Sequence, residues 1–313
     1  MRYHSCMQRE LHGAASGFAE APDGTRIHWS VVGDGAPALV CCDGIGCDGF
    51  AWKYIARDFS TRHRIVRWHY RGHGRSGIPN DASRVGFDDI SSDLDAVLQA
   101  TGTAQAVLLG HSMGVQVALE HHRRRPEQVL GLVLLCGSHG LPLDTFHDNK
   151  ALKILLPSMI TAAARYPQAM SLIWRLAASG EVAYQFATHF EVNGRLVRRD
   201  DFMPYFRHLA GMDPQLFLGM LKHASEHSAF DHLPHVNVPT LIVAGTDDTF
   251  TPYWLSQQMH SRIPGAELLT VPGGTHVAPI EQPELITLRL EKFLAGIPER
   301  GAAPAASAPP KRT

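Results

Sequence analysis

The sequence predicts an α/β fold: a mostly parallel, doubly wound sheet with an inserted helical cap. Short apolar runs alternate with amphipathic stretches of helical length, which indicates parallel strands joined by helices on both faces of a sheet. This alternation stops between residues 138 and 237 and then resumes, which indicates an insertion. With 313 residues and 44% hydrophobic content, the chain can bury the core that this fold requires.

Seven apolar runs bounded by turn residues are expected to be strands. They are Arg26–Val32, Ala38–Cys42, Arg64–His69, Ala106–Leu109, Val129–Cys136, Thr240–Ala244 and Glu267–Val271. Stretches with apolar residues at helical spacing are expected to be helices. They are Phe50–Phe59, Asp88–Ala100, Met113–Arg123, Pro252–Arg262 and Glu281–Leu294.

These elements divide the chain into five parts. Residues 1–20 are expected to be an N-terminal extension, residues 21–137 and 238–298 the two parts of one core domain, and residues 138–237 the cap. Residues 299–313 are rich in Ala, Pro and Ser and are expected to be a disordered tail. Most of the many apolar side chains of the cap are expected to form its own core, and a cap over the site is expected to enclose an apolar, water-poor pocket.

Composition and charge limit the classes of partner and the location that are expected for the protein. A net charge of −1 offers no basic excess for nucleic acid. No segment approaches the roughly 18 uninterrupted apolar residues of a membrane span, and the first 20 residues hold no apolar signal segment, so we expect a cytoplasmic protein. An odd count of five cysteines indicates free thiols, and no chelating spacing indicates a metal. The sequence carries no signal for an oligomeric state.

The pentapeptide Gly110-His111-Ser112-Met113-Gly114 predicts a nucleophile elbow. It lies between a predicted strand and a predicted helix, which is the context that such an elbow requires. A sharp turn projects the serine hydroxyl toward a base, and small flanking residues allow the strand and the helix to approach closely. Ser112 is therefore the candidate nucleophile, and Gly110, His111 and Gly114 are its expected supports.

A candidate acid and a candidate base follow in chain order. Asp247 and Asp248 come after the predicted strand Thr240–Ala244, and His276 comes after the predicted strand Glu267–Val271. Both groups lie beyond the carboxyl ends of predicted parallel strands, the edge where open α/β sheets place their sites. A serine nucleophile needs a histidine base, and the histidine needs a carboxylate that fixes its tautomer.

From about residue 24 to residue 294 the chain resembles the α/β-hydrolase superfamily, in its serine-nucleophile branch with a helical cap. The segment from Gly245 to Pro252 resembles the family's G-x-x-D-x-x-x-P segment, which implies that Asp248 is the acid. Glu281-Gln282-Pro283-Glu284 resembles the segment that follows the family's histidine, which implies that His276 is the base.

The resemblance also implies an oxyanion hole. In this family one backbone amide comes from the residue after the nucleophile, which is Met113 here, and one from the loop after the third strand. That loop contains Gly44 and Ile45, and the amide of Ile45 is the second expected donor.

Two positions depart from the family's pattern. Asp43 stands where histidine is usual, and Tyr70 stands where aspartate is usual. A carboxylate near a developing oxyanion is unfavourable unless it points away or is paired, so Asp43 is expected either to order its loop or to lie in a surface turn. Arg71, His73 and Arg75, in the loop that follows Tyr70, are expected to be scaffold residues.

The sequence therefore predicts a serine hydrolase that cleaves esters of small to medium apolar acids through an acyl-enzyme on Ser112, without a metal or organic cofactor. Carboxylesterase is the broadest interpretation. Lactonase, thioesterase and perhydrolase activities stay open, and so does meta-cleavage-type carbon–carbon hydrolysis, in which Arg175, Arg195 or Arg207 would bind a carboxylate. A ligand-binding receptor of the same fold is the alternative that is not an enzyme.

Overall fold

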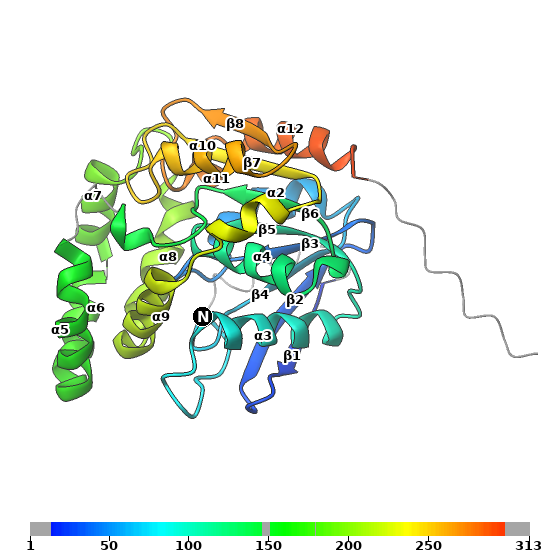
Figure 1. The fold of residues 1–313 in the computed structure, drawn as a ribbon. Helices are drawn as coiled ribbons and strands as arrows, with labels where there is room; N and C mark the ends of the chain where they lie inside the picture. The colour runs from blue at the N-terminus through cyan, green and yellow to red at the C-terminus, as the bar shows by residue number, and fades with distance from the viewer. Residues whose placement is uncertain (1–13, 146–150, 179, 298–313) are drawn as a thin grey trace, which may run out of the picture.

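An eight-stranded sheet in the order β1-β2-β4-β3-β5-β6-β7-β8 forms the centre of the computed structural model, which describes residues 14–145, 151–178 and 180–297 (Figure 1). β1 (Ala15–Glu20), β2 (Arg26–Val32) and β4 (Ile65–Trp68) pair in antiparallel fashion. The remaining pairs are parallel. They join β4 and the following strands: β3 (Ala38–Cys42), β5 (Ala106–His111), β6 (Val129–Leu135), β7 (Thr240–Gly245) and β8 (Glu267–Val271). The mostly parallel sheet that the sequence predicts is confirmed.

All seven expected strands form, and β1 is an additional strand that the sequence analysis missed. It lies within residues 1–20, for which an extension is predicted. Its six residues include only one large apolar side chain, Phe18, most of them are exposed, and the strand pairs only at the edge of the sheet, so it lacks the apolar run of the buried strands. Residues 1–13 and the predicted tail 299–313 lie outside the described residues.

Helices cover both faces of the sheet. Val40 and Cys42 pack on one face with α3 (Phe87–Ala100) and α4 (Met113–Arg124). Leu39 and Cys41 pack on the other face with α2 (Lys53–Phe59) and α12 (Pro283–Leu294). Successive side chains of a strand point to opposite faces, so a run that is apolar throughout is buried from both sides.

Two predicted helices are interrupted. The segment predicted as Phe50–Phe59 is a 3-10 turn, Phe50–Trp52, followed by α2. The segment predicted to begin at Glu281 is the short α11 (Ala278–Glu281) followed by α12, which begins at Pro283. Proline is favoured at the first helical position and disfavours helical backbone at the residue before it, so it sets this boundary.

Between β6 and β7 the described residues form five α-helices, at the left of the sheet in Figure 1. They are α5 (Ala151–Arg165), α6 (Pro167–Ala178), α7 (Gly180–Phe190), α8 (Arg199–Gly211) and α9 (Pro214–Glu226). Asp201 of α8 is buried and fixes this cap to the core, because it pairs with Lys53 and accepts a hydrogen bond from the hydroxyl of Tyr54. Phe202 and Phe206 are buried as expected, whereas Leu172 and Ile173 are exposed.

Candidate active site

Ser112 forms a sharp turn between β5 and α4. Its backbone has φ 56° and ψ −120°, a strained conformation for a residue with a side chain. A Cβ atom at Gly110 would lie 2.3 Å from the carbonyl oxygen of Gly114, and one at Gly114 would lie 2.0 Å from the carbonyl oxygen of Cys42. β5 and β3 thus approach α4 so closely that neither glycine can be exchanged without a shift of the backbone.

Gly114→Ala is expected to lower the free energy of unfolding by about 3 kcal/mol or more, because the added methyl group meets rigid backbone. Urea unfolding measures this loss. Gly211→Ala is the matched control, since Gly211 is also helical and a Cβ there has no neighbour within 4 Å. There the better helix propensity of alanine is expected to leave stability within about 1 kcal/mol of the parent. Equal stability of Gly114→Ala and the parent would contradict the close approach.

Three predicted site residues lie in a hydrogen-bonded row. Nε2 of His276 is 2.9 Å from Oγ of Ser112, and Nδ1 of His276 is 3.0 Å from Oδ2 of Asp248. Asp248 is buried, whereas Asp247 is exposed and accepts a hydrogen bond from the hydroxyl of Thr246. Of the two candidate acids, Asp248 is therefore the one that contacts the histidine.

Local contacts hold Asp248 in place. Its Oδ1 accepts hydrogen bonds from the backbone amides of Phe250 and Thr251, each at 2.9 Å. Its Oδ2 accepts from the hydroxyl of Thr251 at 2.8 Å. The ring of Phe250 stacks on the imidazole of His276, with the ring centroids 4.8 Å apart. Phe250 and Thr251 carry no role in the sequence analysis, although an aspartate that bonds amides two and three residues later is a common turn pattern.

His111 supports the backbone of His276. Its Nε2 donates to the carbonyl oxygen of His276 at 2.8 Å. Burial lowers the pKa of His111 to about 4, so the ring is neutral near pH 7. The residue before the candidate nucleophile thereby fixes the loop that carries the candidate base.

Glu281 is a second support that the sequence analysis missed. Its buried carboxylate accepts hydrogen bonds from the amide and hydroxyl of Thr275, at 2.7 and 2.6 Å, and from the amide of Asn193 at 2.9 Å. Burial raises its pKa. Thr275 precedes His276 and Asn193 belongs to the cap, so Glu281 fastens the histidine loop to the cap. The available signal was its place in the segment that resembles the one after the family's histidine.

The loop after β3 lies directly on the turn at Ser112. A Cβ at Gly44 would be 3.0 Å from Cβ of Ser112. Within the described ranges, the amides of Ile45 and Met113 donate to no protein acceptor. The next amide, that of Gly46, donates to Nε2 of His73 at 3.1 Å. Burial lowers the pKa of His73 to about 3, which leaves the neutral ring able to accept this bond. His73 thus holds the loop.

The two departures from the family's pattern meet in the structure. The indole of Trp52 donates to Oδ1 of Asp43 at 2.6 Å, and the hydroxyl of Tyr70 donates to the carbonyl oxygen of Asp43 at 2.7 Å. Asp43 is buried, so the surface turn considered for it is wrong, and the carboxyl group is paired. Burial raises its pKa to about 8.

Asp43→Asn is expected to raise the temperature of unfolding, and more at pH 8 than at pH 5. Between the ordinary pKa of 3.8 and about 8, the folded chain holds a proton on Asp43 that the unfolded chain has released, so the stability of the parent falls as pH rises through this window. Asparagine cannot ionise, so the variant does not lose this stability. Its unfolding temperature is therefore expected to lie several °C above that of the parent at pH 8. Ester turnover should persist, because the amides of Ile45 and Met113 remain.

Thermal unfolding of both proteins from pH 5 to 8.5 measures the effect, and Asp34→Asn serves as the control because Asp34 is exposed. A constant difference between Asp43→Asn and the parent at all pH values, or loss of turnover in folded Asp43→Asn, contradicts this account.

Of the five arginines named in the sequence analysis, one is buried and four are exposed. Arg71 is buried and makes two hydrogen bonds to the carboxylate of Asp93, at 2.8 and 2.6 Å, as a scaffold residue does. Arg175, Arg195 and Arg207 of the cap are all exposed.

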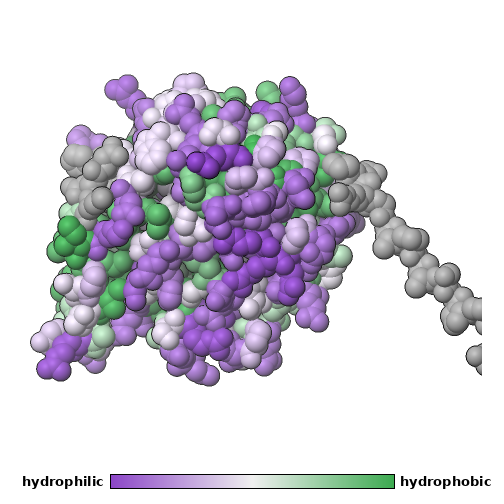
Figure 2. All heavy atoms as spheres, viewed as in Figure 1, coloured by the Kyte–Doolittle hydropathy of each residue, from purple (hydrophilic) through white to green (hydrophobic). Residues whose placement is uncertain are grey.

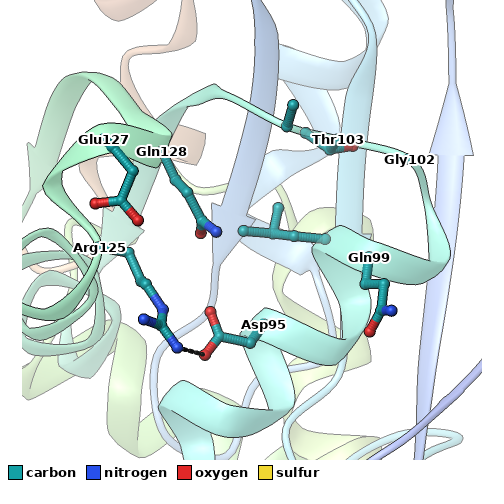
Figure 3. Close-up of a pocket in the computed structure, with 9 residues that line it drawn as sticks. Asp95, Gln99, Gly102, Thr103, Arg125, Glu127 and Gln128 are labelled. Carbon is teal, nitrogen blue, oxygen red and sulfur yellow. Dashed lines mark ion pairs between the residues drawn. The ribbon is translucent and has the colours of Figure 1, made fainter.

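Figure 3 shows a shallow hollow on another part of the core domain. Its volume is about 570 Å³. Thr103 and Gln128 line it, and they precede β5 and β6, whereas Ser112 follows β5. Asp95 and Arg125 form an ion pair across it at 3.6 Å. The hollow is therefore at the amino end of the strands, opposite the edge that carries Ser112.

Two further features concern the described part of the chain only. None of its helices is long and apolar enough to cross a membrane. No group of three or more His, Cys, Asp or Glu side chains in it is arranged to hold a metal ion.

A parallel sheet with a nucleophile elbow at its carboxyl edge is the architecture of a hydrolytic α/β enzyme. The model of the alpha/beta hydrolase fold family matches residues 37–283, and the chain belongs to this family. A curated relative is a putative carbamate hydrolase, RutD, of Azorhizobium caulinodans, which is 27% identical over 277 residues that cover 87% of this chain and 96% of the relative.

Solved structures share the fold. An esterase, EaEST, from Exiguobacterium antarcticum has a TM-score of 0.69 at 22% identity, with 89% of this chain and 98% of that chain covered. An enol-lactonase from Burkholderia xenovorans has a TM-score of 0.71 at 18% identity, with 89% of this chain and all of that chain covered (100%). At these identities the likeness shows the fold alone.

Proposed function

We propose that the protein is a serine carboxylesterase that cleaves esters of small to medium apolar acids, with Ser112, His276 and Asp248 as its catalytic triad. The observation that carries the proposal is the unbroken row of contacts from Ser112 Oγ through His276 to the buried Asp248. The putative carbamate hydrolase that is 27% identical to this chain supports a hydrolytic reaction, and the esterase EaEST shares its fold.

In the proposed reaction, Oγ of Ser112 attacks the ester carbonyl while Nε2 of His276 takes its proton. Asp248 stabilises the imidazolium that forms. The amides of Ile45 and Met113 are free to hold the oxyanion of the tetrahedral intermediate. His276 then gives its proton to the departing alcohol, and a water molecule activated by His276 releases the acid from Ser112.

Apolar side chains next to these residues support an apolar substrate. Phe250 covers the imidazole of His276. Leu209 and Phe217 of the cap come so close to Gly46 that a Cβ there would lie 3.0 and 3.2 Å from them. Carbon–carbon hydrolysis of a dienoate acid is the weaker candidate, because the three cap arginines suggested for its carboxylate are exposed.

Hydrolysis of para-nitrophenyl esters with acyl chains from acetyl to dodecanoyl tests the proposal, together with a fluorophosphonate that labels active serines. We expect multiple turnovers, an optimum at short to medium chains, and a label that mass spectrometry locates on Ser112. One acyl transfer followed by no release, with tight ligand binding, would favour the receptor alternative. Cleavage of a dienoate without cleavage of any ester would favour carbon–carbon hydrolysis.

A further inference from the structure

The cap exposes a group of large apolar side chains on α5, α6 and the residue between them. Ile154 is 74% exposed and Leu155 55%, Tyr166 is 61% exposed, and Leu172 and Ile173 are 53% and 59% exposed. We call these five residues the outer cap face. In Figure 2, hydrophobic residues gather at the left edge of the molecule, where α5 and α6 lie in Figure 1. A patch of this kind marks an interaction site on a soluble domain.

The opposite side of α6 is already packed. The indole of Trp174 donates to the carbonyl oxygen of Leu209 at 2.7 Å, and its ring lies 4.8 Å from that of Phe217. Leu172 precedes Trp174 by two residues, about 160° around the helix, and Ile173 precedes it by one, about 100°, and both side chains are exposed. The helix is apolar on both sides, a pattern normally found in a helix that is covered on both sides.

The charged residues within α5, Tyr166 and α6 are all basic. Residues 151–178 contain Lys153, Arg165 and Arg175 but no aspartate or glutamate, although the whole chain has 30 acidic and 29 basic residues. Lys153 is paired with Asp144 at 2.5 Å, which leaves the two exposed arginines as the charges that flank the face. A second copy docked on the same face would bring its own arginines and no carboxylate from these helices, so the charges of the two faces would not be complementary.

We propose that the outer cap face docks on a lipid bilayer surface that carries anionic headgroups. The apolar side chains enter the boundary of the acyl chains, and Arg165 and Arg175 meet lipid phosphates. Tyr166 suits this depth because its ring is apolar and its hydroxyl is polar. The proposal does not depend on hydrolysis. If the proposed function holds, docking brings bilayer-dissolved esters to the cap, whose residues Leu209 and Phe217 join α6 to the loop at Gly46.

Flotation of the full chain with vesicles tests this proposal. The vesicles are phosphatidylcholine alone or phosphatidylcholine with one part in about four of phosphatidylglycerol. We expect the parent to float with the anionic vesicles, and less with the neutral vesicles or in high salt. The double variant Leu172→Ser/Ile173→Ser is expected to lower the bound fraction at least about tenfold. Leu288→Ser is the matched control, because Leu288 on α12 is 68% exposed but lies in the core domain.

Thermal unfolding, and hydrolysis of a short water-soluble ester without vesicles, show whether the double variant is folded, and both are expected to match the parent. A parent that stays unbound to anionic vesicles overturns the proposal, as does a double variant that binds as well as the parent. So does a parent dimer in analytical ultracentrifugation that the double variant converts to a monomer without vesicle binding. Failure of ester turnover in the parent would refute the proposed function and leave vesicle binding unaffected.

Discussion

Ser112→Ala is expected to lower kcat/KM for the best nitrophenyl ester by at least about 10⁴-fold, while the protein stays folded. The variant keeps the amides of Ile45 and Met113 but has no oxygen within reach of Nε2 of His276, so no acyl-enzyme can form. Alanine adopts the strained backbone at φ 56° at a cost similar to that of serine, so the unfolding temperature is expected to stay within a few °C.

Ser138→Ala is the matched control for this substitution. Ser138 is also buried, in the loop after β6, and its hydroxyl donates to the carbonyl oxygen of Gly140 at 3.1 Å. The hydroxyl also accepts from the amide of Gly140 at 3.4 Å, so its loss costs two hydrogen bonds, about 1–2 kcal/mol of stability, and is expected to leave turnover near that of the parent. If Ser112→Ala retained more than a small fraction of the parent's turnover, with its unfolding temperature unchanged, the proposal of an acyl-enzyme on Ser112 would be abandoned.

The features predictable from the sequence are those that local pattern determines. The strand Ala38–Cys42 is found at its predicted bounds because a buried strand of a parallel sheet needs a continuous apolar run. The turn at Ser112 is local as well, since Gly110 and Gly114 are required within the same pentapeptide. β1 was not predicted, because a short edge strand exposes most of its residues and needs no continuous apolar run.

Contacts between distant segments could not be predicted in this way. Glu281 meets Asn193 across 88 positions, and this contact exists only because the cap folds back on the histidine loop. The pairing of Asp43 with Trp52 likewise depends on the fold of the loop after β3. The burial of the cap's apolar residues was also predicted only in part. Most of them were expected to be buried, but Leu172 is exposed, because helical spacing does not reveal whether a second apolar side of a helix is covered.

Asp248→Asn is expected to lower kcat by about 10⁴-fold, because only one orientation of the asparagine side chain keeps the hydrogen bonds from the backbone amides, and in that orientation it holds His276 in the wrong tautomer. Oδ1 of Asp248 accepts two backbone amides, so the amide oxygen of asparagine must occupy this position. Its NH₂ group then takes the place of Oδ2, 3.0 Å from Nδ1 of His276. A donor there forces the histidine proton onto Nε2, which faces Ser112 and can no longer accept its proton.

Asp247→Asn provides the comparison, because the two carboxylates are adjacent in sequence but only Asp248 contacts His276. Asp247 is exposed and bonds the hydroxyl of Thr246, which an asparagine oxygen can also accept, so kcat is expected to stay within about twofold of the parent. Steady-state kinetics of both variants, with unfolding temperatures measured alongside, decide between the two acids. A large loss in Asp247→Asn with normal turnover in Asp248→Asn would reverse the assignment, and equal small losses would mean that His276 needs no carboxylate to hold its tautomer.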